Sequence, residues 1–130
     1  MTHEEALRSL HPEKLSPCYL VYGEEPFFVN QVLRWFIENA VPEELCPFNY
    51  NRFDGDKITP KEVIIIAKSY PMGGRQRMII LDHAEKIKDP EEHLLSYLNA
   101  PSQTTVMVFV APKPDMRTRF FAGLKKQAAL

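Results

Sequence analysis

Two short runs of consecutive apolar residues limit most strongly what this chain can fold into. They are Arg77–Asp82 (RMIILD) and Thr104–Val110 (TTVMVFV). A strand with one face in water usually alternates apolar and polar residues, whereas a strand buried on both faces stays apolar throughout. The runs are therefore predicted to be strands of a mostly parallel sheet that is covered by helices on both sides.

Breaker and capping residues divide the rest of the chain. Aromatic and β-branched content predicts two further strands, Cys18–Tyr22 and Phe48–Phe53. Helices are predicted over residues 4–10, 26–40, 60–69, 89–99 and 116–128. Their starts are indicated by proline near the first helical position or by a capping residue, namely Thr2, Thr59, Asp89 or Asp115. This alternation predicts a three-layer α/β domain over residues 1–130, because 130 residues suffice for one ordinary core.

Composition excludes several function classes. Lys and Arg number 16 against 17 Asp and Glu, so no overall basic field marks a free-standing nucleic-acid binder. Four histidines without ligand spacing predict no metal, and no G-x-S-x-G motif or other catalytic constellation is present. The chain has two cysteines outside any C-x-x-C spacing, an acidic amino terminus and no apolar run of membrane length. These features predict a cytoplasmic protein with no membrane contact.

The turn after the first strand lies where a nucleotide-binding α/β protein holds phosphate. A P-loop would read G-x-x-x-x-G-K-[ST], but here Gly23 is followed by Glu24, Glu25 and a proline. The two carboxylates would repel a phosphate, and they also suit the positive end of the next helix with no ligand. Asp82 ends a strand where a magnesium-binding carboxylate would stand, or it is simply a turn residue. We therefore expect no nucleotide cofactor.

The loop Tyr70–Arg77 (YPMGGRQR) places Pro71 and Met72 where sheet packing requires no apolar side chain. Methionine is common on adaptable protein-binding surfaces. Two alternatives remain open at this stage. Met72 could fold back onto the domain's own core, or Gly73 and Gly74 could form a phosphate nest with the arginines that follow them.

The last predicted helix is basic. Its region contains Arg117, Arg119, Lys125 and Lys126, which could contact DNA. The alternative is that these residues form the solvated face of a terminal helix.

Five segments, taken in order and spacing, resemble one known family. They are YLVYGEEPFFVNQ, FNYNRFDGD, SYPMGGRQRMIIL, LLSYLNAPSQTTVMVFV and KPDMRTRFFAGLKKQ. Together they look like the N-terminal AAA+ domain of the delta subunit of the bacterial DNA polymerase III clamp loader. The similarity extends over nearly the whole chain from about Tyr19.

The resemblance implies an AAA+ P-loop fold without a working nucleotide site, in a protein that binds and opens the sliding clamp without hydrolysing ATP. By position, the apolar pair that enters the clamp's pocket corresponds to Pro71 and Met72, with Tyr70 beside it to supply bulk. A polymerase holoenzyme, other loader subunits and DNA are the further partners implied. A phosphate-binding domain and a DNA-binding module are the alternatives.

The family also has a fifth strand, a helical lid domain and a C-terminal collar domain. All of these would lie beyond residue 130, so the chain is expected to be the first domain of a longer protein. The fifth strand would flank Cys18–Tyr22, which is therefore expected at a sheet edge. Clamp binding without loader assembly is the expected behaviour.

Overall fold

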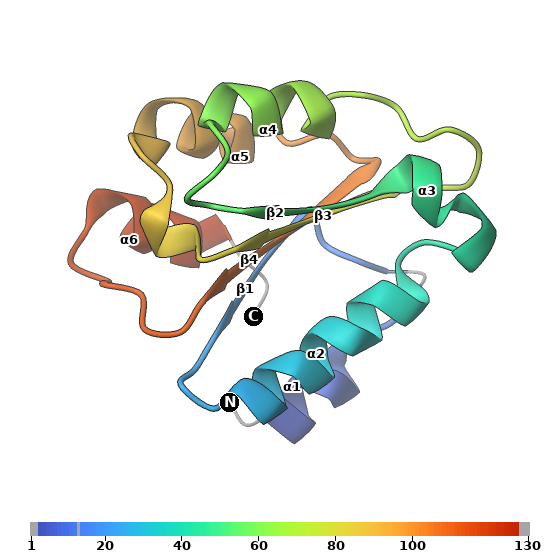
Figure 1. Ribbon diagram of the computed structural model, residues 1–130, viewed down its shortest axis with the longest axis horizontal. Helices are drawn as coiled ribbons and strands as arrows, with labels where there is room; N and C mark the ends of the chain where they lie inside the picture. Colours follow the sequence, from blue (N-terminus) through green and yellow to red (C-terminus); the bar gives the residue numbers. More distant parts are fainter. Residues whose placement is uncertain (1–2, 13, 128–130) are drawn as a thin grey trace.

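Four parallel strands form the middle layer of the protein (Figure 1). The computed structural model describes residues 3–12 and 14–127. The strands are β1 (Cys18–Tyr22), β2 (Tyr50–Asp54), β3 (Arg77–Asp82) and β4 (Thr105–Ala111), in the order β1-β4-β3-β2. All three strand pairs are parallel. The prediction of a parallel sheet is confirmed, and the two apolar runs are its central strands.

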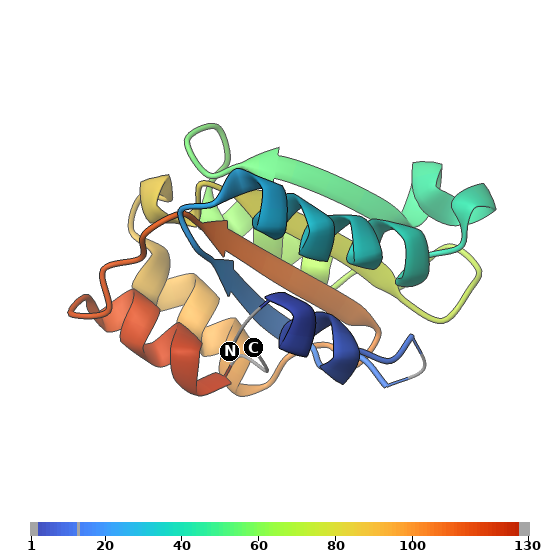
Figure 2. The same ribbon diagram turned by 90° about the horizontal axis from the view of Figure 1, so that it is seen from below.

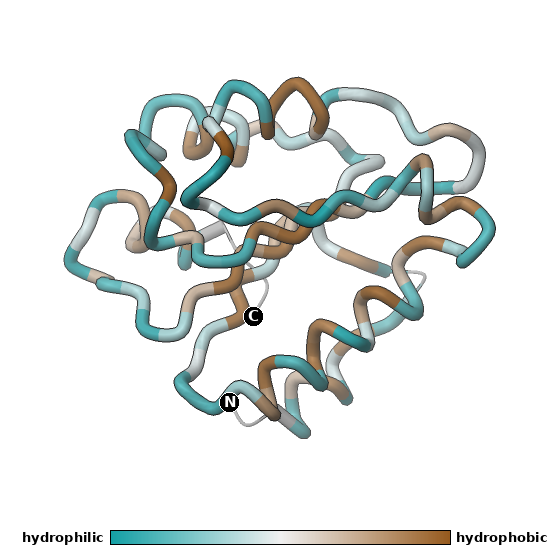
Figure 3. Tube along the Cα trace, in the orientation of Figure 1, coloured by the Kyte–Doolittle hydropathy of each residue, from teal (hydrophilic) through white to brown (hydrophobic). Residues whose placement is uncertain are grey.

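Side chains of the central strands point alternately into two separate cores. Ile79 and Leu81 of β3 pack with one layer of helices, and Met78 and Ile80 pack with the other. All four are fully buried. Figure 3 shows the apolar residues of these strands in the middle of the molecule. A strand with two buried faces needs apolar residues at every position, which explains the runs seen in the sequence.

Helices cover both faces of the sheet. On one side lie α1 (His3–Ser9) and α2 (Pro26–Asn39), and on the other lie α4 (Pro60–Ala67), α5 (Ser96–Asn99) and α6 (Arg119–Gln127), as Figures 1 and 2 show. Short helical turns join these layers to the strands: η1 (Glu43–Leu45), α3 (Cys46–Asn49), η2 (Ala84–Lys86) and η3 (Glu91–Leu95). The predicted three-layer α/β architecture is thus confirmed.

Helix starts were predicted with mixed success. Thr59 caps α4 as expected, since its Oγ1 accepts a hydrogen bond from the Glu62 amide at 3.3 Å. At α6 the cap is Thr118, whose Oγ1 accepts from the Phe121 amide, and the helix begins at Arg119. Asp89 adopts a left-handed backbone with φ +50° and does not cap a helix; η3 follows it as a π-helical turn. The predicted positions Thr2 and Ala128 lie outside the described residues.

The second strand begins later than the aromatic pattern predicts. Phe48 and Asn49 belong to the helical turn α3, and β2 starts only at Tyr50. Pro47 near the start of α3 suits a helical turn, and the Asn49 side chain is buried against another loop instead of lying on a sheet face. A tertiary contact has therefore overridden the local β preference.

The predicted sheet edge and the predicted thiols agree with the structure. β1 has β4 on one side and is the terminal strand of the described sheet, as expected. Burial raises the pKa of Cys18 to about 12, so this thiol stays protonated at neutral pH. Both cysteines are free. Among the described residues, no helix combines the length and apolar character needed to cross a membrane.

Candidate partner-binding site

The loop between α4 and β3 displays apolar side chains to solvent. Tyr70 is 81% exposed and Met72 is 63% exposed, while Pro71 between them is half-buried. Figure 1 shows this loop extending from the end of α4 towards α3. The alternative in which Met72 folds back onto the core is therefore wrong. We call Tyr70, Pro71 and Met72 the tip.

The tip's backbone is held by the buried side chain of Asn49, at the end of α3. Asn49 Oδ1 accepts a hydrogen bond from the Met72 amide at 2.6 Å. Its Nδ2 donates to the carbonyl oxygens of Met72 and Gly73, both at 3.2 Å. One side chain of zero exposure thus satisfies three main-chain groups of a loop that lies more than twenty positions later in the sequence.

Arg77, the first residue of β3, holds the other end of the tip. Its Nη2 donates to the Tyr70 carbonyl oxygen at 3.3 Å. Its Nη1 donates to the Phe48 carbonyl oxygen at 3.1 Å and to Asn51 Oδ1 at 3.3 Å. Arg77 is 8% exposed, and its guanidinium joins the tip to the α3–β2 junction. Because the Arg77 side chain is buried and its N–H groups donate to these protein oxygens, it is not available for the predicted phosphate nest.

Two glycines return the chain from the tip to β3. Gly73 and Gly74 have φ +74° and φ +65°, a left-handed conformation that side chains disfavour. A Cβ on Gly74 would lie 2.7 Å from Leu45 Cδ1, so a larger residue there would also require the Leu45 side chain to move. The glycines that suggested a phosphate nest therefore have a backbone role of their own.

Two more exposed apolar residues lie on the elements that flank the tip. Ile65 of α4 is 69% exposed, and Phe48 of α3 is 54% exposed. The sequence contained one signal for Ile65. Four consecutive apolar residues, Val63–Ile66, cannot all face inward on a helix that has one wet side.

The degenerate nucleotide-site positions lie at the opposite edge of the sheet. The turn of Gly23, Glu24 and Glu25 follows the carboxyl end of β1, and Asp82 ends β3, whereas the tip precedes β3. A six-residue strand separates the two edges by roughly 20 Å. The tip and the predicted nucleotide-site positions therefore lie at opposite ends of the strands.

Asp82 and Glu24, two of the carboxylates at these positions, each have a cation beside them. Arg52 pairs with Asp82 in a bidentate geometry, at 2.6 Å from Nε to Oδ2 and 3.1 Å from Nη2 to Oδ1. Lys113 Nζ lies 3.9 Å from Glu24 Oε1. Glu25 precedes α2 without a side-chain capping bond. A phosphate at this turn would therefore face the two exposed glutamates, Glu24 and Glu25.

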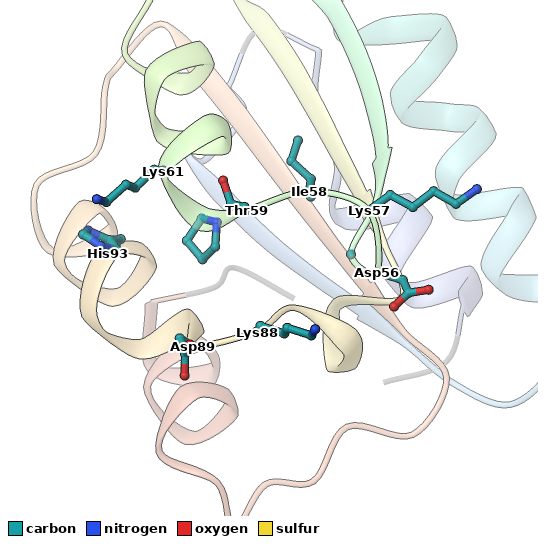
Figure 4. A pocket seen from close by; sticks show the side chains of 10 residues that line it. Asp56, Lys57, Ile58, Thr59, Lys61, Lys88, Asp89 and His93 are labelled. Carbon is teal, nitrogen blue, oxygen red and sulfur yellow. The ribbon is translucent and has the colours of Figure 1, made fainter.

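A cavity of about 490 Å³ opens between the β2–α4 connection and the segment that leads into η3. Its lining includes Lys57, Lys61, Lys88 and His93 together with two aspartates, Asp56 and Asp89. Figure 4 shows the Lys57 and Lys61 side chains extending in opposite directions, so they do not converge on one anion. None of the predicted nucleotide-site residues lines it, and the described residues contain no cluster suited to a metal ion.

The predicted DNA contacts lie on and just before α6. Arg119, Lys125 and Lys126 are exposed. Arg117 is also exposed, but its guanidinium donates two hydrogen bonds to Asp115, at 3.0 and 3.1 Å, and these bonds lower the pKa of that carboxyl. These cations are therefore accessible to a partner, and DNA contact remains a prediction.

Comparisons with known proteins agree on one family. Residues 19–130 match the family described as DNA polymerase III, delta subunit. The chain is 30% identical to DNA polymerase III subunit delta of Bacillus subtilis (strain 168) over 132 aligned positions, which cover 93% of this chain and 38% of that protein.

Solved structures give the same fold. The Bacillus subtilis DNA clamp loader delta protein superimposes with a TM-score of 0.84 at 28% identity, over 97% of this chain and 40% of that one. A DNA polymerase III gamma subunit-related protein of Thermotoga maritima gives a TM-score of 0.68 at 14% identity, over 98% of this chain and 44% of that one, a likeness of fold alone. The chain spans about two fifths of the length of these relatives. This chain, with its AAA+-like fold, belongs to the DNA polymerase III delta subunit family.

Proposed function

We propose that this chain is the clamp-binding part of a clamp-loader delta subunit, and that its tip docks into an apolar pocket of the sliding clamp. The observation that carries the proposal is the contrast within one loop. The side chains of Tyr70 and Met72 are 81% and 63% exposed, while the backbone beneath them is anchored by two buried side chains. Apolar side chains held rigidly in water suit a partner's pocket better than they suit an isolated domain.

The rest of the proposed role follows from the family. The full-length protein would open the clamp by binding it, without hydrolysing ATP itself, alongside other loader subunits and DNA in the bacterial cytoplasm. The paired carboxylates at the degenerate nucleotide turn support an ATP-independent role. Ile65 and Phe48 widen the apolar surface that a clamp could cover.

Calorimetric titration of the 130-residue chain into the sliding clamp of the same organism tests the proposal. Burying a methionine contributes about 1.5–3 kcal/mol, so Met72→Ser should weaken binding by about tenfold to a hundredfold. Phe27→Ser is the matched control, because Phe27 is equally exposed, at 63%, but follows β1 at the other edge of the sheet.

The control variant should bind with unchanged affinity. An equal loss of affinity in both variants would mean that the contact with the clamp is not specific to the tip. An unchanged Kd for Met72→Ser would show that Met72 is not part of the interface and would contradict the proposal.

A further inference from the structure

The tip is anchored by more main-chain hydrogen bonds than a surface turn needs. Four backbone atoms, the Tyr70 oxygen, the Met72 nitrogen and oxygen, and the Gly73 oxygen, are bonded to side chains from outside the loop. A surface loop ordinarily leaves such groups to water. Because water would satisfy these groups at little cost, the anchoring limits the conformations of the loop more than it adds stability.

One of the two anchoring side chains, that of Arg77, is a poor choice for stability alone. Arg77 begins a strand whose next four residues are fully buried and apolar, yet it buries a cation there. Its observed acceptors, two carbonyl oxygens and an amide oxygen, are neutral. Its Nε–H has no hydrogen-bond partner among the described residues. Burying a cation with an unsatisfied N–H lowers stability, and such departures from local rules are typical of functional positions.

We infer that Asn49 and Arg77 are positioning residues, which hold the tip in its docking conformation before any partner arrives. The inference rests on the proposed function for the identity of the partner. Asn49 fixes the Met72 end of the tip and Arg77 fixes the Tyr70 end, so together they set the spacing between the two exposed side chains.

Pre-organisation of this kind has a distinct kinetic consequence. If only a fraction of the molecules hold the docking conformation, the apparent affinity falls by that fraction. When loop exchange is fast, the loss appears in the association rate, because the bound complex keeps all its contacts. A side chain that enters the partner's pocket instead controls the dissociation rate. The two kinds of residue can therefore be told apart.

The first measurement uses the free protein. Amide hydrogen exchange should show the Met72 amide protected in the wild type and at least about tenfold faster in Asn49→Ala, with the amides of β4 unchanged. Arg77→Lys is the second variant, since it keeps the charge and most of the buried stem but has a single nitrogen for three acceptors. Arg77→Lys should lose the hydrogen bond to the carbonyl oxygen of Tyr70 or of Phe48, and it should speed amide hydrogen exchange in the loop without unfolding the sheet.

The second measurement is the kinetics of binding to immobilised sliding clamp. Asn49→Ala should lower kon by about tenfold with koff little changed, whereas Met72→Ser should raise koff. Thr105→Val is the control for lost stability, because it removes another buried side-chain bond, from Thr105 Oγ1 to the Ala67 oxygen at 2.6 Å, outside the tip. It should leave both rates unchanged.

The outcomes separate this inference from the proposed function. Rapid Met72 exchange in the wild type, or unchanged exchange in Asn49→Ala, would overturn the positioning role whatever the clamp does. If the Met72 amide is protected in the wild type and loses that protection in Asn49→Ala, but the wild type does not bind the clamp, the anchoring role stands and docking on the clamp is overturned. A change in koff alone would make Asn49 a contact residue and contradict the inference.

Discussion

At the scale of single residues, two carboxylates at the carboxyl ends of the strands are paired with cations. Asp82 is bonded twice to Arg52, and Glu24 lies beside Lys113. The Glu24 pair is highly exposed on both sides and contributes little to stability. A bound nucleotide would compete with Glu24 for Lys113 and would be repelled by the carboxylates of Glu24 and Glu25.

This arrangement predicts that ATP does not stabilise the protein. A ligand that binds only the folded state raises the unfolding temperature in proportion to RT ln(1 + [L]/Kd). A thermal-shift titration with Mg-ATP to millimolar concentration should therefore show no change. A saturable rise would favour the alternative of a phosphate-binding domain over the clamp-binding proposal.

At the scale of elements, α4 connects the described features, because it precedes the tip and its first turn borders the cavity. Its start is fixed by Thr59, by Pro60 in the first turn, and by Glu62 three residues after the cap. A capping threonine contributes about 1 kcal/mol, so Thr59→Ala should lower the free energy of unfolding by about that amount.

Urea denaturation measures this change, and Thr59→Ser is the informative companion. Serine keeps the hydroxyl oxygen that accepts from the Glu62 amide, so its stability should stay close to that of the wild type. If serine proved as destabilising as alanine, the threonine methyl group would be the source of the stability and the capping explanation would fail.

The elements also show how far the sequence could predict the structure. Apolar runs predicted β3 and β4, aromatic and β-branched content predicted β1 and most of β2, and Thr59 predicted the start of α4. The tip was chosen from its loop position. Asn49 was missed because it was assigned to a strand, and nothing local identifies a side chain whose partners are 23 and 24 positions away. Arg77 was correctly placed at the start of a strand, but its side chain was considered only as a phosphate ligand, because its burial depends on the packing of α3 against the start of β3.

At the scale of the whole molecule, the parallel sheet keeps two loop clusters apart. The turn of Gly23 and the residue Asp82 lie at the carboxyl ends of the strands, and the tip lies at their amino ends. Since the chain spans about two fifths of its relatives' length, loader assembly belongs to the longer protein in this account. The central claim is that the amino edge is where this chain meets the clamp.

Chemical-shift mapping tests that claim most directly. The isotope-labelled 130-residue chain is titrated with the unlabelled sliding clamp, and every backbone amide is followed. The account predicts that the largest changes fall on residues 65–74 and on Phe48 and Asn49, with residues 23–28 unaffected. Strongest changes at residues 23–28, with an unperturbed tip, would contradict it.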